Sequence, residues 1–142
     1  MLDNNFDEAW HPGEGWEAMQ GTNFSRYIGP FYYQPVGERV RFCMRTDNRH
    51  DNSHERAHGG VVMSFADEAL GFAGRWTREN VKMFTIEFDC RFLDGIYSGE
   101  IIEVEPEVIK ATGSLMFMRG DLTANGRPVA SCTGVWKVFR NK

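Results

Sequence analysis

Hydrophobic and polar positions divide the chain into one helical segment and two groups of strand-like segments. Residues 59–75 follow a polar loop and are apolar on nearly every face, which is typical of a helix inside a domain. Residues 39–45 and 84–92 alternate polar with apolar residues, which predicts strands with one buried face. In 84–92 the even positions are all apolar and are expected to be the buried ones. The other predicted strands are 27–34, 102–108, 115–122 and 128–139.

Short turns join the later strands and therefore make them antiparallel neighbours. Asn125-Gly126 is a strong signal for a tight hairpin between the last two strands. Pro106 indicates an edge position or a bulge within 102–108. Because one long apolar helix needs a sheet around it, the sequence predicts an α+β domain with an antiparallel sheet curled round a central helix.

The first residues carry no clear period. We expect residues 1–26 to form an arm on the surface, with residues 15–19 in one or two helical turns, and residues 27–142 to form the domain. The length of 142 residues fits one such domain. The chain begins without a basic or apolar stretch, so no signal peptide is expected.

Composition narrows the functional classes. The net charge of −4 argues against non-specific binding to nucleic acid, which needs an excess of Lys and Arg. No apolar run approaches the roughly 20 residues of a membrane span. Cys43, Cys90 and Cys132 are odd in number and lack the C-x-x-C spacing, which predicts a reduced cytoplasmic protein.

The start of the predicted helix is the main candidate for chemistry. Gly59 and Gly60 expose backbone N–H groups at an end that carries a partial positive charge, and Asp67 follows about two turns later. Such an amide end can polarise a carbonyl, and a carboxylate can activate water or attack the carbonyl itself. The plainer alternatives are that the glycines only start the helix and that Asp67 reaches solvent or a partner.

The spacing of these residues resembles a family signature. Asn52, His58-Gly59-Gly60 and Asp67 match the pattern of the hotdog-fold acyl-CoA thioesterases, specifically the PaaI-like branch of the phenylacetate pathway. That pattern is an Asn, His-Gly-Gly six residues later, and an acidic residue nine after the His. Gly71 and Thr85 also fit, and the resemblance covers roughly residues 36–139. The family usually has a glycine three residues after the Asn, where this chain has Glu55.

The resemblance implies a hotdog fold and hydrolysis of an acyl- or aryl-CoA to the free acid and coenzyme A, with no metal or dissociable cofactor. It assigns the Gly59 amide to the oxyanion and Asp67 to the general base or nucleophile. His58 and Asn52 would orient water and the thioester carbonyl, and Thr85 would bond to the water or to the carboxylate across a dimer interface. It also implies a homodimer or homotetramer whose subunits join at their sheet edges and share each site.

Other interpretations stay open. A hotdog module could bind acyl-CoA without turnover, and a dehydratase on the same fold fits the spacing poorly. His50, His54 and His58 recur every fourth residue, which on a helix would suit a metal, but the sequence around them predicts a loop. The basic residues Arg75, Arg78 and Lys82 after the helix either meet the phosphates of coenzyme A or form a solvated helix end.

Overall fold

The computed structural model describes residues 10–21 and 23–141. In chain order the elements are β1 (Glu17–Ala18), α1 (Asn23–Ile28), β2 (Tyr32–Val36), β3 (Arg39–Arg45), the 3₁₀ turn η1 (Asn48–His50), α2 (Gly59–Trp76), β4 (Val81–Phe92), β5 (Ile101–Val104), β6 (Glu107–Ala111), β7 (Leu115–Ala124) and β8 (Arg127–Arg140).

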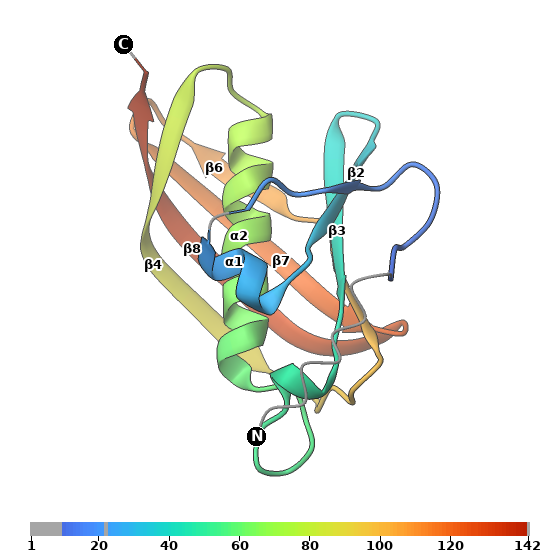
Figure 1. Ribbon diagram of the computed structural model, residues 1–142. Coiled ribbons are helices and arrows are strands. Elements are labelled where there is room, and N and C mark those ends of the chain that lie inside the picture. The colour runs from blue at the N-terminus through green and yellow to red at the C-terminus, as the bar shows by residue number, and fades with distance from the viewer. Residues whose placement is uncertain (1–9, 22, 142) are drawn as a thin grey trace.

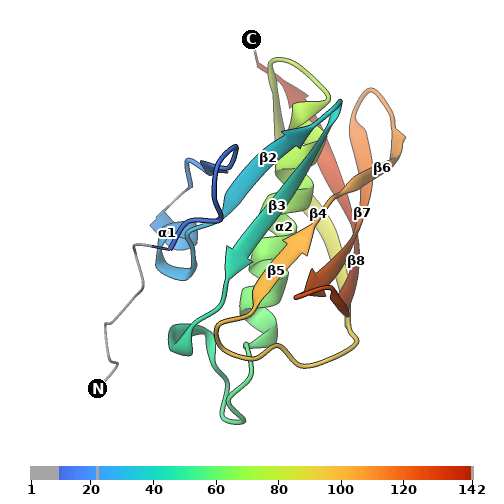
Figure 2. The same cartoon turned by 90° about the vertical axis from the view of Figure 1, so that its right-hand side faces the viewer.

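One antiparallel sheet curls round α2 (Figure 1). Within the described residues its strand order is β1-β2-β3-β5-β7-β8-β4, and β6 pairs with β7 beside this path. Figures 1 and 2 show the sheet on one side of α2 and the short helix α1 on the other. The predicted α+β architecture and the predicted limits of the long helix are confirmed.

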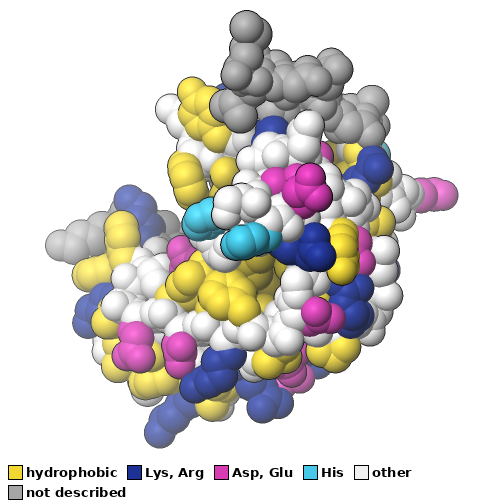
Figure 3. Space-filling view, turned by 90° about the horizontal axis from the view of Figure 1, so that it is seen from below, with side chains coloured by type: hydrophobic (Ala, Val, Ile, Leu, Met, Phe, Trp, Pro, Cys, Tyr) yellow, Lys and Arg dark blue, Asp and Glu magenta, His cyan; other side chains and the backbone are white. Residues whose placement is uncertain are grey.

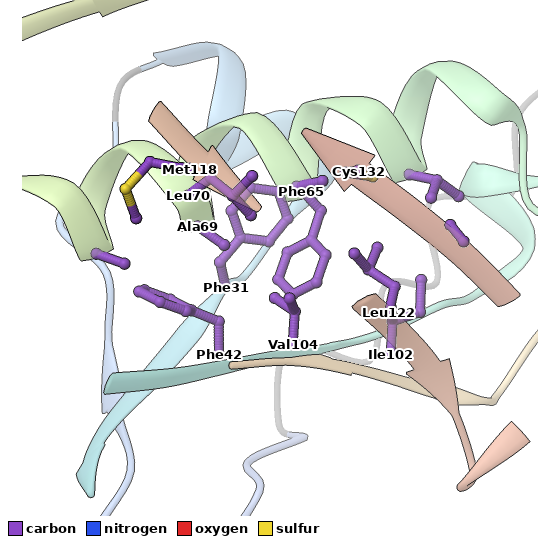
Figure 4. Packing of buried hydrophobic residues seen from close by; sticks show 14 of the residues in the cluster. Phe31, Phe42, Phe65, Ala69, Leu70, Ile102, Val104, Met118, Leu122 and Cys132 are labelled. Carbon is purple, nitrogen blue, oxygen red and sulfur yellow. The ribbon is translucent and has the colours of Figure 1, made fainter. Parts of the chain in front are cut away.

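Small residues let α2 lie close to the sheet. Ala66 and Ala69 are fully buried on the face of α2 that meets the strands. Opposite them, a Cβ at Gly120 of β7 would stand 2.8 Å from Val104 and 2.9 Å from Leu70, so only glycine fits there without a shift. Figure 4 shows the larger core side chains filling the space between α2 and the strands. The position of α2 is therefore fixed by contact at close range.

The N-terminal predictions were partly wrong. Residues 15–19 contain the short strand β1 rather than helical turns, because Glu17 and Ala18 pair with the edge of β2. The predicted strand 27–34 begins only at Tyr32, and Tyr27 belongs to α1. Residues 1–9 of the predicted arm lie outside the described residues. The domain division at 26/27 stays a prediction.

The predicted strand 102–108 is two strands. β5 pairs with β3 and β7, whereas β6 pairs with β7 alone, and the break falls at Glu105 and Pro106. Proline has no N–H to donate to a ladder, which explains the interruption. The predicted hairpin is confirmed, since Asn125 (φ 49°) and Gly126 (φ 83°) both adopt the left-handed conformation of a tight turn between β7 and β8.

A bulge divides β4 and overturns its predicted burial pattern. The register against β8 shifts between Thr85 and Glu87. Before the bulge the odd positions Val81 and Met83 pack on the core, and after it the even positions Phe88 and Cys90 do. Phe84 and Ile86, predicted to be buried, are therefore exposed by 59% and 58%. An extra residue in one strand changes which face each later side chain takes.

In the part of the chain that the structure describes, no helix is both long and apolar enough to cross a membrane.

We predict that Gly120→Ala lowers the free energy of unfolding by about 1–3 kcal/mol, because the added methyl group overpacks the contact between α2 and the sheet. Gly113→Ala is the matched control, since a Cβ at Gly113 meets nothing within 4 Å. Urea denaturation of both variants at one protein concentration measures the effect. Equal stability of the two variants would contradict the close contact.

Candidate active site

His58 caps the start of α2. The side-chain Nδ1 of His58 accepts a hydrogen bond from the backbone N–H of Gly60 at 2.9 Å. The backbone N–H of His58 donates to the carbonyl of His50 at 2.7 Å. Because Nδ1 is an acceptor, the neutral imidazole carries its proton on Nε2, which leaves a donor on an exposed side chain. His58 therefore caps the helix with Nδ1, and this is compatible with a further role of Nε2–H toward a ligand.

Gly59 offers the open donor at this helix end. The amides of Gly60, Val61 and Val62 are all bonded to His58. Among the described residues, no acceptor is recorded for the N–H of Gly59. A Cβ built on Gly59 would lie 3.1 Å from the ring of Phe92. The ring therefore stands close to this amide and narrows the approach to it. A single unpaired N–H at the positive end of a helix can stabilise an oxyanion.

Asp67 and Thr85 form the second half of the site. The hydroxyl of Thr85 donates to Oδ1 of Asp67 at 2.7 Å. The bulge in β4 makes this contact possible, because it leaves Thr85 in phase with the inward-facing Met83. The resemblance implied that Thr85 bonds to the attacking water or to the carboxylate across a dimer interface, whereas this bond to the carboxylate forms within one chain. With one oxygen held by Thr85, Asp67 presents its other oxygen from a half-buried position.

Glu68, next to Asp67, is half-buried. It lines an open cavity of about 480 Å³ beside α1, together with aromatic residues that include Phe31 and Tyr32. Burial, and then the charge of Asp67, raise the pKa of Glu68 above its usual value. Sequence reasoning missed the cavity because α1 was not predicted.

Asn52 organises the loop before α2. Its Oδ1 accepts hydrogen bonds from the backbone N–H groups of His54 and Arg56 at 2.8 and 3.2 Å. Glu55 stands within this turn at φ 59°, the left-handed conformation for which glycine is favoured. The loop thus keeps a glycine-type backbone at the position where the resembling family has glycine. Because the side-chain oxygen of Asn52 is already used twice, its amide group is the part left to meet a ligand.

The three histidines of this region do not converge. His50 is buried, its Nδ1 accepts from the N–H of Asp47, and its Nε2 bonds to the carbonyl of Ile28 at 2.7 Å. Burial holds the pKa of His50 below its usual value, so the neutral form is favoured. No group of three or more potential metal ligands occurs within residues 10–21 and 23–141. The arrangement gives the metal-binding interpretation no support.

Arg75, Arg78 and Lys82 lie at the other end of α2 from Gly59. Arg78 donates to the carbonyl of Thr112 at 2.6 Å and so joins the helix end to the β6–β7 turn. Sixteen positions separate Gly59 from Arg75, which is about 24 Å at the helical rise. Their role toward the phosphates of coenzyme A stays untested.

Comparison with known proteins places the chain in a family. The model of the thioesterase superfamily matches residues 54–131. A Pseudomonas aeruginosa protein provisionally named esterase PA0474 is 32% identical over 111 residues, which is 77% of this chain and 83% of that protein.

Solved structures show the same fold. A Haemophilus influenzae thioesterase, HI1161, has a TM-score of 0.76 at 16% identity and covers 84% of this chain and 85% of its own. A Streptococcus pneumoniae hypothetical thioesterase solved with coenzyme A has a TM-score of 0.72 at 18% identity, covering 79% and 88%. A mutant of the phenylacetic acid degradation protein PaaI from Thermus thermophilus has a TM-score of 0.73 at 17% identity, covering 82% and 98%. The chain therefore has the hotdog fold.

We predict that Glu55→Gly raises the free energy of unfolding by up to about 1 kcal/mol. Glycine removes a left-handed penalty of about 1–2 kcal/mol, and part of that gain is offset by the greater freedom of glycine in the unfolded chain. Glu55→Ala is the control, because it removes the carboxylate but keeps the Cβ that makes this backbone unfavourable. Denaturant titration should show a gain for glycine only, and an equal gain for alanine would assign the effect to charge.

Proposed function

This chain belongs to the thioesterase superfamily and is a thioester hydrolase, and we propose that its substrate is an acyl-CoA cleaved in a site that two subunits share. The observation that carries the proposal is the pair formed by the open N–H of Gly59 and the Asp67 carboxylate held by Thr85. The Streptococcus pneumoniae structure solved with coenzyme A supports the choice of carrier.

One chain cannot bring these two groups to one carbonyl. Gly59 and Asp67 are eight positions apart on α2, which corresponds to about 12 Å along the helix axis. An oxyanion donor must lie about 3 Å from the oxygen, and a general base must be in hydrogen-bond reach of the attacking water. A second subunit that brings its own helix start to Asp67 satisfies both requirements.

The edge strand β4 is suited to make that contact. It is 12 residues long and ends the sheet on one side among the described strands. A long edge with exposed apolar residues tends to pair with another chain. If two copies of β4 pair antiparallel about a two-fold axis near Phe88 and Asp89, Thr85 of one copy lies opposite Phe92 of the partner subunit. Because Phe92 touches Gly59 and Thr85 holds Asp67, this register forms two complete sites per dimer.

The chemistry of such a site is general base hydrolysis. The free oxygen of Asp67 accepts a proton from water while the water oxygen attacks the thioester carbon. Gly59 of the partner subunit donates to the developing oxyanion, and His58 Nε2–H is placed to assist it. When the carbon–sulfur bond breaks, the thiolate takes up the proton and leaves as coenzyme A, and the acyl group leaves as the acid. Direct attack by Asp67, with a transient anhydride, uses the same geometry.

The cavity beside α1 is suited to receive the acyl group. Glu68, the residue after Asp67 on α2, lines this cavity, and the walls are partly aromatic. A ring or a medium-length chain suits such a lining. We assign the protein to the cytoplasm, where Cys43, Cys90 and Cys132 would stay reduced, which agrees with the absence of a disulfide among the described cysteines. A homodimer or homotetramer is the proposed assembly.

We predict that Asp67→Asn lowers kcat for acyl-CoA hydrolysis by about 10²-fold or more, because asparagine keeps the shape of aspartate but neither accepts the proton nor attacks. Release of the free thiol measures turnover across aryl-, short-chain and long-chain acyl-CoAs. Asp121→Asn, on an exposed position of β7, is the matched control for loss of one carboxylate. A kcat for Asp67→Asn within a few-fold of wild type would reject the assignment. Wild-type binding of acyl-CoA without any thiol release would favour a non-catalytic module.

We predict that Asp67→Asn and a bulky substitution such as Gly59→Leu complement one another when their subunits are mixed. A mixed dimer carries one site with both lesions and one with neither, so it should regain up to half of the wild-type activity. Each variant refolded alone is the control, and native mass spectrometry verifies the mixing. Full activity of a wild-type monomer, or no recovery in verified mixed dimers, would count against the shared site.

A further inference from the structure

Two loops beside the start of α2 are joined into one rigid rim. The N–H of Ala57, in the loop before α2, donates to the carbonyl of Ile96 at 2.8 Å. Arg127 holds the loop after β4 by contacts to Asp94 and Glu100, both at 2.8 Å, and to the carbonyl of Gly95 at 2.7 Å. A group presented on this rim is therefore preorganised.

Arg56 lies partly buried on the rim, and one of its guanidinium nitrogens is used in recorded hydrogen bonds. Its side chain lies across Gly95, where a Cβ would stand 3.2 Å from it, and its guanidinium lies 3.9 Å from the ring centroid of Tyr97. Nη1 donates to the carbonyls of His54 and Glu55. Among the described residues no carboxylate pairs with Arg56, so its charge is not neutralised and its other nitrogens can meet an anion.

An apolar strip leads from the catalytic amide to this arginine. Phe92 touches Gly59, and the chain continues through Leu93 to Tyr97. These three side chains are 53%, 59% and 51% exposed. The hydrogen bond from Ala57 to Ile96 keeps Tyr97 close to the start of α2. Figure 3 shows this end of the molecule, where histidine and basic side chains stand beside an apolar hollow.

We propose that Arg56 and Tyr97 bind the nucleotide end of coenzyme A, with the phosphates on the Arg56 guanidinium and the adenine stacked on the face of Tyr97 that Arg56 leaves open. The pantetheine arm then lies along Phe92 and Leu93 and brings the thioester to Gly59. This assignment rests on the proposed acyl-CoA thioesterase function. Stacking on an aromatic ring and a charge-assisted bond to phosphate are the two contacts that such a nucleotide requires.

The basic residues at the far end of α2 are the competing phosphate site. Arg78 is partly used in the bond to Thr112, and no aromatic ring is recorded against its guanidinium among the described residues. Arg75, in the same group, lies 5.7 Å from the ring centroid of Phe72, but it is about 24 Å from Gly59 along the helix. Arg56 lies three residues before Gly59 and 3.9 Å from the ring centroid of Tyr97, so the observations favour the rim.

The test compares an acyl-CoA with the same acyl group on pantetheine, which lacks the nucleotide. Arg56→Ala and Tyr97→Ala should each raise KM for acyl-CoA about tenfold and leave kcat and the KM for acyl-pantetheine unchanged. Arg119→Ala, an exposed arginine on β7, is the matched control and should change neither constant. An equal rise in KM for both substrates would mean that Arg56 only holds its loop. No rise for either variant, with a rise for Arg78→Ala, would place the nucleotide at the far end of α2.

Binding of adenosine 3′,5′-bisphosphate, measured by calorimetry, separates this proposal from the proposed function. Wild type should bind the bisphosphate, and Arg56→Ala should bind it at least tenfold more weakly. Circular dichroism verifies that the variant is folded. If wild type releases thiol from neither substrate, the proposed function fails and the calorimetry still decides the nucleotide site. Equal affinities of wild type and Arg56→Ala would overturn it.

Discussion

The close packing of α2 against the sheet is the constraint on which the site depends. Gly120 and the buried alanines hold the helix at a distance that larger side chains would increase. At that distance Thr85 reaches Asp67, and Phe92 at the end of the same strand reaches Gly59. β4 therefore contacts both reactive positions of the helix. The bulge lies between Thr85 and Phe92. Because a bulge changes which face the later side chains take, the two residues can each point toward the helix although one position is odd and the other even.

Under the proposed function, the same constraint makes the isolated chain incomplete. Gly59 and Asp67 are eight positions apart on one rigid helix, which is about 12 Å along its axis. Side-chain motion cannot close that distance, so one chain cannot bring both residues to one carbonyl. An antiparallel pair of β4 strands resolves this, because a two-fold axis brings the Gly59 end of one strand to the Asp67 end of the other. The exposed Phe84 and Ile86 agree with this, since they lie on the strand that would be paired. Catalysis and assembly then depend on one strand, so a substitution in β4 should seldom alter only one of them.

The sequence predicted the parts of this molecule that depend on periodicity and on backbone chemistry. The α2 limits, the Asn125-Gly126 hairpin and the antiparallel sheet all follow from local pattern. The errors arose where distant contacts decide the outcome. The short strand β1 exists because β2 offers an edge, and the bulge at Ile86 is visible only in the pairing with β8. For the same reason, the motif spacing identified Asp67 and Thr85 but not that they bond within one chain.

Hydrogen-bond occupancy separates the roles of the residues in the motif. His58 and Asn52 both have structural work, because one caps α2 and the other closes its loop with two backbone bonds. Each keeps one donor group for a ligand, so neither role excludes the other. Gly59 differs because its N–H has no recorded partner among the described residues, and an open helix N–H of this kind can bond to water or to a ligand. His58 takes the neighbouring amide of Gly60, so in the proposed mechanism the Gly59 N–H is the one left for the oxyanion.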